Sequence, residues 1–235
     1  MGLKTDLEKE VDGILSQTWS TRDGTVVPTT TDVALAGGGV KLNAVMLYAD
    51  LADSTILAAT YDRRIAAKVY KAFLACASRI IKAHNGVIRS FDGDRVMAVF
   101  LGSTPNTNAA KSALQIKWAV ENIVRPKLEA KYEAIRNGEY KISHAVGIDV
   151  SEVLVVRGGV RNDNDLIWIG RAPNVAAKLC ALRGTYRTFI TADVYKKLSN
   201  EAKTSDGKNM WVEQAWSAPG GVDTIYKSSW GWVIS

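Results

Sequence analysis

The order of apolar runs along the 235-residue chain predicts an α+β fold, in which extra strands and short helices are added to a ferredoxin-like βαββαβ core. Three observations support this fold class. A short apolar run ends at Asp50 and is followed by a segment with helical spacing. Two β-rich runs flank Asp92-Gly93-Asp94, which is a hairpin pattern. A second long helical segment and a further strand then complete the order.

Residues 1–41 are predicted to form an N-terminal helix and arm that precede the core. A short amphipathic helix is expected over 3–17, because apolar residues recur there every four positions, at Leu3, Leu7, Val11 and Leu15. Residues 18–41 contain a run of threonines and three consecutive glycines, so an irregular arm is expected. The pattern changes at residue 42, and residues 42–235 are predicted to form one domain.

The first half of this domain is predicted to contain a strand, a helix and a hairpin. Asp53 and Ser54 are suitable N-caps for the helix, and Gly86 is expected to close it. The predicted elements are a strand over 45–49, a helix that ends near His84, and hairpin strands over 87–91 and 95–101.

The second half is predicted to begin with a long helix over 107–136. Pro126 should divide or kink this helix, because proline has no amide hydrogen to donate. Residues 157–165 are polar and are expected to form a loop. The other predicted elements are strands over 141–150, 153–156 and 166–169, helices over 173–182 and 191–198, and edge strands at 211–212 and 224–227.

Composition excludes several classes of site. The chain has only two cysteines and two histidines, so a zinc or iron site is not expected, and Cys76 and Cys180 are interpreted as reduced core residues. His144 is interpreted as a strand residue whose hydrogen bonds are satisfied. No apolar stretch has the length of a membrane span, and the start lacks the apolar region of a secretory signal. We therefore expect a cytoplasmic protein without a membrane partner.

The formal net charge of +6 indicates an anionic partner. Nucleic acid and a polyphosphate nucleotide both fit this charge. The basic residues are spread along the chain without a block and without interleaved aromatic residues, so they also fit a solvated basic surface, and we expect no nucleic-acid partner. Steep salt-dependent binding to any duplex distinguishes a nucleic-acid binder from the other two.

Asp50 and Asp94 are the first candidate site residues. The strand that ends at Asp50 and the hairpin turn that carries Asp94 are able to lie side by side, which brings both carboxylates to one end of the sheet. Such a pair is costly unless cations bridge it, and hard divalent ions suit carboxylate ligands. Both positions are also common in ordinary turns and caps. The following residues lie at a helix start, where free backbone amides, those of Ser54 and Thr55 included, favour phosphate.

Three segments resemble the motifs of class III adenylate and guanylate cyclases. Val45–Thr55 is similar to the first metal motif, which has an aromatic residue two positions before the aspartate and Ile or Leu after it. Gly93–Phe100 resembles the second metal motif, a Gly-Asp pair followed by an apolar strand. Gly170–Leu179 resembles the third motif, Gly-x-x-x-Asn-x-Ala-x-Arg. The motifs stand in the order and at the spacing of the family, from about Ala44 to Leu182.

This resemblance implies that residues 42–235 form a class III cyclase catalytic domain that uses two divalent metal ions, Mn²⁺ or Mg²⁺. Asp50, Leu51 and Asp94 would hold the metals. The ribose 3′-hydroxyl of a nucleoside triphosphate would attack the α-phosphorus, and pyrophosphate would leave. The third motif would come from the partner subunit of a head-to-tail homodimer, so that the active site forms at the subunit interface and Asn174 orients the ribose.

Lys178 departs from the family pattern, because the family usually has a transition-state arginine at this position. Lysine supplies charge without a planar fork. It therefore fits a catalytic phosphate-binding residue, a slower enzyme or a plain surface lysine. Arg161 and Arg171 are neighbouring alternatives for binding the phosphates. A degenerate domain that binds nucleotide without turnover is a further alternative, against which the intact Asp50 and Asp94 argue.

Ser90 and Ile167 occupy the two positions that read the purine base in the family. The family has Lys and Asp there in adenylate cyclases, and Glu and Cys in guanylate cyclases. Losing both polar partners should remove selection for a purine. Tyr48, where phenylalanine is common, either fills space in the base pocket, which favours a pyrimidine, or is a core aromatic residue.

The combination of Tyr48–Thr55, Arg89–Arg95 and Pro173–Leu179 resembles the bacterial Pycsar pyrimidine cyclases. That resemblance implies a uridylate cyclase, which converts UTP to cyclic UMP and pyrophosphate in antiphage defence, and a separate effector that senses the cyclic nucleotide. Arg89 and Asp92 are the nearest polar candidates for contacts with the base. Formation of cyclic CMP and adenylate cyclase activity are the alternatives.

Overall fold

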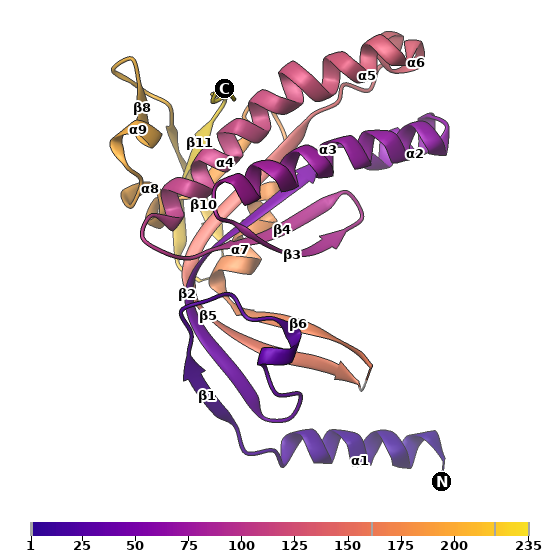
Figure 1. Cartoon of the computed structure of the whole chain (residues 1–235), viewed down its shortest axis with the longest axis vertical. Coiled ribbons are helices and arrows are strands. Elements are labelled where there is room, and N and C mark those ends of the chain that lie inside the picture. The colour runs from indigo at the N-terminus through magenta and orange to yellow at the C-terminus, as the bar shows by residue number, and fades with distance from the viewer. Residues whose placement is uncertain (1, 161, 219, 235) are drawn as a thin grey trace. The chain divides into compact units, whose positions relative to one another are not determined.

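The computed structural model describes residues 2–160, 162–218 and 220–234 (Figure 1). Contacts between residues divide the chain into two compact units. The first unit contains Met1–Asn43 and Glu152–Gly170, and the second contains Ala44–Ser151 and Arg171–Ser235. Among the described residues, no helix combines the length and the apolar character that crossing a membrane requires.

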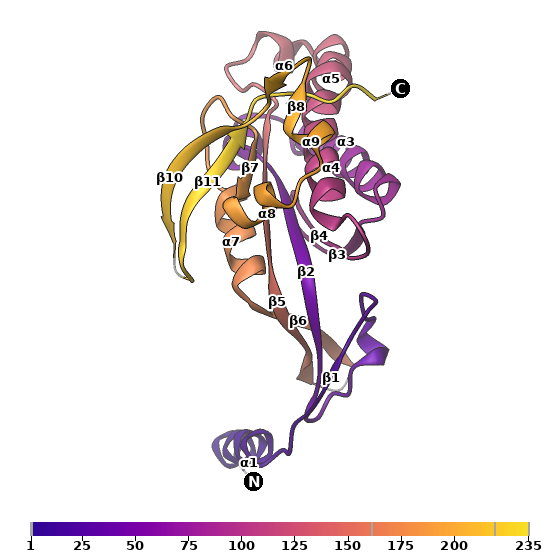
Figure 2. The same ribbon diagram turned by 90° about the vertical axis from the view of Figure 1, so that its left-hand side faces the viewer.

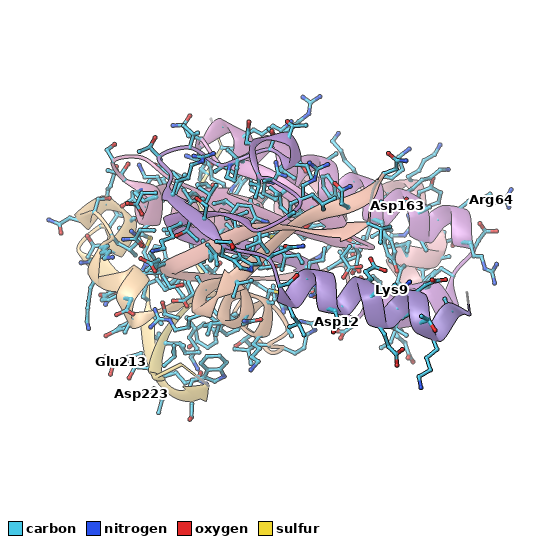
Figure 3. The ribbon with its side chains drawn as sticks, turned by 90° about the horizontal axis from the view of Figure 1, so that it is seen from below. Lys9, Asp12, Arg64, Asp163, Glu213 and Asp223 are labelled. Carbon is cyan, nitrogen blue, oxygen red and sulfur yellow. The ribbon has the colours of Figure 1, made fainter. Side chains whose placement is uncertain are left out.

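Helix α1 (Leu3–Leu15) begins the first unit and confirms the predicted N-terminal helix. None of its residues is buried, and Leu3 and Leu15 are each at least 75% exposed. Lys9 and Asp12 lie along this helix in Figure 3. The helix therefore presents both its apolar and its charged side chains on the surface of its own unit.

The predicted irregular arm over 18–41 is wrong in part, because it contains a paired strand. Strand β1 (Ser20–Asp23) pairs in parallel with the start of β2 (Gly38–Leu51). A short 3-10 helix, η1 (Thr30–Asp32), lies between them. The glycines permit a close approach of the two segments, since a Cβ on Gly37 would lie 2.3 Å from the carbonyl oxygen of Thr18.

The predicted polar loop over 157–165 is also wrong, because this segment belongs to an antiparallel ribbon. Strand β5 (His144–Val160) pairs with β6 (Asp163–Gly170) from Val153 opposite Gly170 to Val160 opposite Asp163. Half of the side chains on an exposed ribbon face water, so its sequence is as polar as that of a loop. Polarity alone therefore does not distinguish the two.

A mixed sheet forms the centre of the second unit, with the strand order β10-β11-β7-β5-β2-β4-β3. This sheet and the order of its elements confirm the predicted α+β fold with a βαββαβ core. The strands not yet introduced are β3 (Val87–Asp92), β4 (Arg95–Phe100), β7 (Thr188–Thr191), β10 (Val212–Ala218) and β11 (Val222–Ser228). A separate small hairpin joins β8 (Thr204–Ser205) to β9 (Lys208–Asn209).

Helices cover both faces of this sheet (Figure 2). Helices α3 and α4 pack on one face in the main hydrophobic core, and α7 packs on the other face in a smaller cluster around Val175 and Leu179. The helices are α2 (Ser54–Thr60), α3 (Arg63–Ala83), α4 (Pro105–Ala119), the π-helix η2 (Val120–Val124), α5 (Arg125–Lys131), α6 (Glu133–Asn137), α7 (Arg171–Cys180), α8 (Ala192–Lys196) and α9 (Asn200–Lys203).

Three details of the helix ends differ from or refine the predictions. The long helix α3 is capped by Asp62, whose carboxylate accepts a hydrogen bond from the amide of Arg64 at 2.8 Å. Asp53 precedes the short helix α2 instead, where it has a left-handed backbone with φ of 55° and makes no side-chain cap. At its other end the left-handed residue is Asn85, not Gly86. The predicted division near Pro126 is confirmed, since η2 directly precedes α5.

Candidate active site

Strand β2 carries the first site residues because its side chains alternate between the two faces of the sheet. Val45, Leu47 and Ala49 are fully buried in the core beneath α3 and α4. Tyr48 and Asp50 therefore point to the opposite face, which is the face that α7 covers. Asp50 lies at the end of the strand and is 7% exposed.

The pairing of β2, β4 and β3 places further candidates on this same face. Residues directly opposite one another in antiparallel strands share a face of the sheet. Two rows of three residues result, which we call the Asp50 row (Asp50, Arg95 and Asp92) and the Tyr48 row (Tyr48, Met97 and Ser90). The candidate metal ligand and two candidate base contacts thus lie two residues apart on neighbouring rows.

The charges of Asp50 and Asp94 are incompletely neutralised. Burial raises the pKa of Asp50, and the nearby charge of Asp94 raises it further. The Oδ2 atom of Asp94 is buried without a hydrogen-bond partner among the described residues. A buried carboxylate oxygen without a donor fits a hard divalent cation. No group of three or more His, Cys, Asp and Glu residues gathers in the described part of the chain, so a cation held by Asp50 and Asp94 would need further oxygen ligands, such as the carbonyl of Leu51 or a phosphate.

Two arginines act as counter-ions for Asp50, and one of them also reaches Asp53. Arg95 Nε lies 3.5 Å from Asp50 Oδ1. Arg183 Nη2 donates a hydrogen bond to Asp50 Oδ2 at 3.3 Å, and Arg183 Nε lies 3.6 Å from Asp53 Oδ1. Sequence reasoning did not select Arg183. Its carboxylate partner Asp50 is 133 residues away in the sequence, so no local pattern marks the contact. The position of Arg183 just after the third motif was the one feature of the sequence that could have suggested it.

The turn that follows Asp50 is held by the segment before β5. The amide of Ala52 donates to the carbonyl of Ser143 at 2.9 Å, and the hydroxyl of Tyr140 donates to the carbonyl of Ala52 at 3.0 Å. Burial raises the pKa of Tyr140, so this hydroxyl keeps its proton. The turn leads directly into α2, where Ser54 is half-buried and Thr55 is exposed.

A cavity of about 440 Å³ opens beside this turn. Both acidic and basic side chains line it. Its lining residues are Asp53, Ile56, Glu139, Tyr140, Lys141, Ser143, Arg183, Gly184 and Arg187. Arg183 lines this cavity and also contacts Asp50, so the cavity lies next to the carboxylate site.

Helix α7 presents Asn174 and Lys178 on its exposed face, four residues apart. Arg171, in contrast, has a structural role. Its guanidinium donates to the fully buried Asp149 at 3.1 and 3.2 Å and to Asp193 at 2.7 Å. The suggestion that Arg171 binds the phosphates is therefore not supported, because these contacts occupy its side chain.

The candidate base contacts differ in their surroundings. Tyr48 is half-buried, and burial raises the pKa of its hydroxyl. Ser90 Oγ lies 3.6 Å from Met97 Sδ, and Arg89 Nε is buried without a partner among the described residues. Ile167 lies on β6 in the first unit and is 49% exposed. Arg161 lies outside the described residues.

His144 does not have the satisfied hydrogen bonds that we predicted. Both ring nitrogens are buried and lack a partner among the described residues. Burial lowers the pKa of His144 to about 3, so the ring is neutral, and it packs 6.1 Å from the ring of Phe73. The histidine behaves as an apolar residue of the core.

Full-length relatives are found among curated proteins, although no protein-family model matches the chain. The sequence is 43% identical over 235 residues to a uridylate cyclase of Xanthomonas perforans, with all of both chains covered. It is 42% identical over 236 residues to a uridylate cyclase of Burkholderia cepacia, again with complete coverage of both. A uridylate cyclase of Rhodovulum sp. (strain MB263) is 44% identical over 233 residues, which cover 98% of this chain and 97% of the relative.

Solved structures of cyclases share the fold. The guanylyl cyclase Cya2 has a TM-score of 0.66 at 18% identity, over 83% of this chain and 95% of that chain. The adenylyl cyclase CyaB of P. aeruginosa has a TM-score of 0.62 at 20% identity, over 81% of this chain and 95% of that chain. These likenesses confirm the class III cyclase fold, and the identity of more than 40% to full-length relatives shows that the chain belongs to the uridylate cyclase family of nucleotidyl cyclases.

Proposed function

We propose that the protein converts UTP to 3′,5′-cyclic UMP and pyrophosphate, with Mn²⁺ or Mg²⁺ held by Asp50, Asp94 and the carbonyl of Leu51. The single observation that carries this proposal is the register of β2, β4 and β3, which sets the Tyr48 row beside the Asp50 row on one face. The printed names of the full-length relatives support UTP as the substrate.

The reaction exchanges one phosphorus–oxygen bond for another. The oxygen of the ribose 3′-hydroxyl forms a bond to the α-phosphorus, and its proton passes to water. The bond from the α-phosphorus to the oxygen that bridges to the β-phosphate breaks, and pyrophosphate leaves with that electron pair. Divalent cations held by Asp50 and Asp94 would lower the pKa of the attacking hydroxyl and neutralise phosphate oxygens. We propose that Asp50 and Asp94 hold these cations and that the amides of Ser54 and Thr55, at the start of α2, bind phosphate oxygens.

The Tyr48 row provides the proposed base selection. Tyr48 is half-buried next to the carboxylates, so its ring reduces the space for a base and favours a single-ring pyrimidine. Ser90 supplies a hydroxyl on the same row, and the adjacent Arg89 supplies a buried nitrogen that has no partner among the described residues. Asp92 lies on the adjacent row. These polar groups are the proposed hydrogen-bond partners of uracil.

The proposal includes a homodimer and a downstream partner. Asn174 and Lys178 lie on the exposed face of α7, where they are accessible to a second subunit. We propose that they complete the partner's site, Asn174 at the ribose and Lys178 as a point charge on the phosphates. Cyclic UMP would then act as a second messenger for a separate effector in antiphage defence.

Purified protein incubated with UTP and Mn²⁺ tests this function directly. We expect cyclic UMP and pyrophosphate in equal amounts, with both lost in Asp50→Ala. Arg79→Ala, which changes an exposed arginine of α3, is the matched control and should keep full activity. UTP binding without pyrophosphate release by the unmodified protein contradicts the proposal and supports a degenerate nucleotide-binding domain.

A further inference from the structure

Arg183 occupies a position that a divalent cation and a guanidinium cannot share. Its Nη2 donates to Asp50 Oδ2 at 3.3 Å, and its Nε lies 3.6 Å from Asp53 Oδ1. The Asp50 side chain is only 10% exposed, whereas the Arg183 side chain is 38% exposed. The Nη1 of Arg183 also donates to the carbonyls of Cys180 and Leu182 at 3.1 and 3.2 Å, so an exchange of partners has to move the guanidinium away from these carbonyls or turn it about them. A cation bound to Asp50 repels the guanidinium and takes its hydrogen-bond acceptor.

A second set of contacts lies within reach of the same side chain. The cavity beside the turn is lined by three basic residues, Lys141, Arg183 and Arg187, and by the carboxylates of Asp53 and Glu139. Arg187 is half-buried, and its Nη1 donates to the carbonyl of Gly184 at 2.8 Å. Burial and the nearby charge of Arg125 lower the pKa of Arg187, and the charges of Glu121 and Asp53 offset this only in part. An anion in this cavity would relieve that repulsion.

We propose that Arg183 exchanges partners during the reaction, from Asp50 and Asp53 in the nucleotide-free protein to the β- and γ-phosphates of the substrate when a divalent cation binds Asp50. Arg187 and Lys141 complete the pyrophosphate subsite in the same cavity. This inference rests on the proposed cyclase function, since it names the residues that hold the leaving group. The planar guanidinium suits the exchange, because it makes bidentate contacts with carboxylate and with phosphate alike.

Opposite changes in two affinities test the exchange in Arg183→Ala. Mn²⁺ titrated into the nucleotide-free protein and followed by electron paramagnetic resonance should bind about threefold more tightly, the scale of a partly exposed ion pair that no longer competes. Pyrophosphate, measured by calorimetry at fixed Mg²⁺, should bind at least about tenfold more weakly. Arg187→Gln should weaken pyrophosphate binding alone, and Arg79→Ala should change neither affinity.

An unchanged or weaker affinity of Arg183→Ala for Mn²⁺, or an unchanged affinity for pyrophosphate, overturns the inference. Arg183→Lys retains the positive charge but loses the planar guanidinium, so both affinities should change in the same directions by smaller factors. It replaces Arg183→Ala if that variant does not fold. Neither binding measurement requires turnover. If Arg183→Ala shows both changes but the wild-type protein makes no cyclic nucleotide, the proposed function is refuted. If the wild-type protein turns over normally but Arg183→Ala shows neither change, only the role of Arg183 is refuted.

Discussion

The negative charge of Asp50 is disfavoured by burial and by Asp94, and two arginines compensate for it only in part. Burial and the charge of Asp94 raise its pKa, while Arg95 and Arg183 lower it. Asp50 thus lies close to a second carboxylate, and its two arginines offset the effect of burial only in part. This imbalance predicts different responses of stability and activity when one carboxylate is removed.

The first such prediction concerns Asp94→Asn. Without a like charge beside Asp50, the metal-free protein should unfold at a slightly higher temperature, measured by calorimetry in EDTA. Cyclisation with Mn²⁺ should fall by about a thousandfold, since a charge that stabilises the reacting centre is lost. A lower unfolding temperature together with retained activity would mean that Asp94 is an ordinary turn residue.

Tyr48 supplies a prediction about selectivity. Tyr48→Ala should enlarge the base pocket, so the ratio of kcat/KM for UTP over ATP should fall about tenfold, which is the usual scale for a change of pocket size. Tyr48→Phe keeps the ring and is the matched variant that separates size from the hydroxyl. If the ratio is unchanged in Tyr48→Ala, Tyr48 is only a core residue.

Sequence reasoning selected the residues of the site that carry local patterns and missed those that do not. Asp50 lies near the end of a recognisable strand and Asp94 lies in a recognisable hairpin turn, and the pairing of β2 with β4 brings the two together. Arg183 and Tyr140 make their site contacts across 133 and 88 residues, and no local pattern marks such contacts. For the same reason, the unsatisfied nitrogens of His144 were not expected from its place in a strand.

At the scale of elements, the contact between α7 and β5 fixes where the third motif lies. A Cβ on Gly147 of β5 would lie 2.2 Å from the carbonyl oxygen of Ala176 and 2.5 Å from the amide nitrogen of Cys180. Helix backbone thus rests directly on the strand at this glycine. Asn174 and Lys178 depend on this contact for their positions, because they belong to the same helix.

Gly147→Ala is therefore predicted to displace α7. It should reduce the free energy of unfolding by about 2–3 kcal/mol, because backbone atoms cannot yield as a flexible side chain does. Denaturant unfolding measures this loss, and Gly93→Ala offers a comparison, since nothing lies within 4 Å of a Cβ there although its φ is 59°. A stability loss at Gly147 no larger than at Gly93 would contradict the close packing.

Elements whose apolar residues recur at a regular spacing were predictable from the sequence. Strands held mainly by backbone pairing to another strand were not. Helix α3 keeps its buried residues on one stripe, so its existence followed from spacing. The ribbon of β5 and β6 continues through residues that read as a polar loop, because backbone pairing and not side-chain pattern holds it. Strand β1 is fully exposed and likewise has no burial pattern to reveal it.

At the scale of the whole molecule, the proposed homodimer predicts complementation between two inactive variants. In the Asp50→Ala variant, a subunit cannot hold the metal ions of its own site. In the double variant Asn174→Ala and Lys178→Ala, a subunit cannot complete the site of its partner. If subunits exchange at random, an equal mixture should recover about a quarter of the wild-type activity, because half of the dimers then contain one intact site. Exchange is checked with differently tagged subunits. A mixture that exchanges but stays inactive would place the whole site within one chain.

The central claim is that an intact two-carboxylate site is combined here with a pocket for a pyrimidine base. Its most direct test is one reaction that contains equal amounts of UTP, CTP, ATP and GTP with Mn²⁺, in which the cyclic products are separated and identified by mass. Cyclic UMP should dominate, and Asp50→Ala should yield no cyclic product. A dominant cyclic purine would contradict the assignment of the Tyr48 row to base selection, and cyclic products from Asp50→Ala would contradict the site itself.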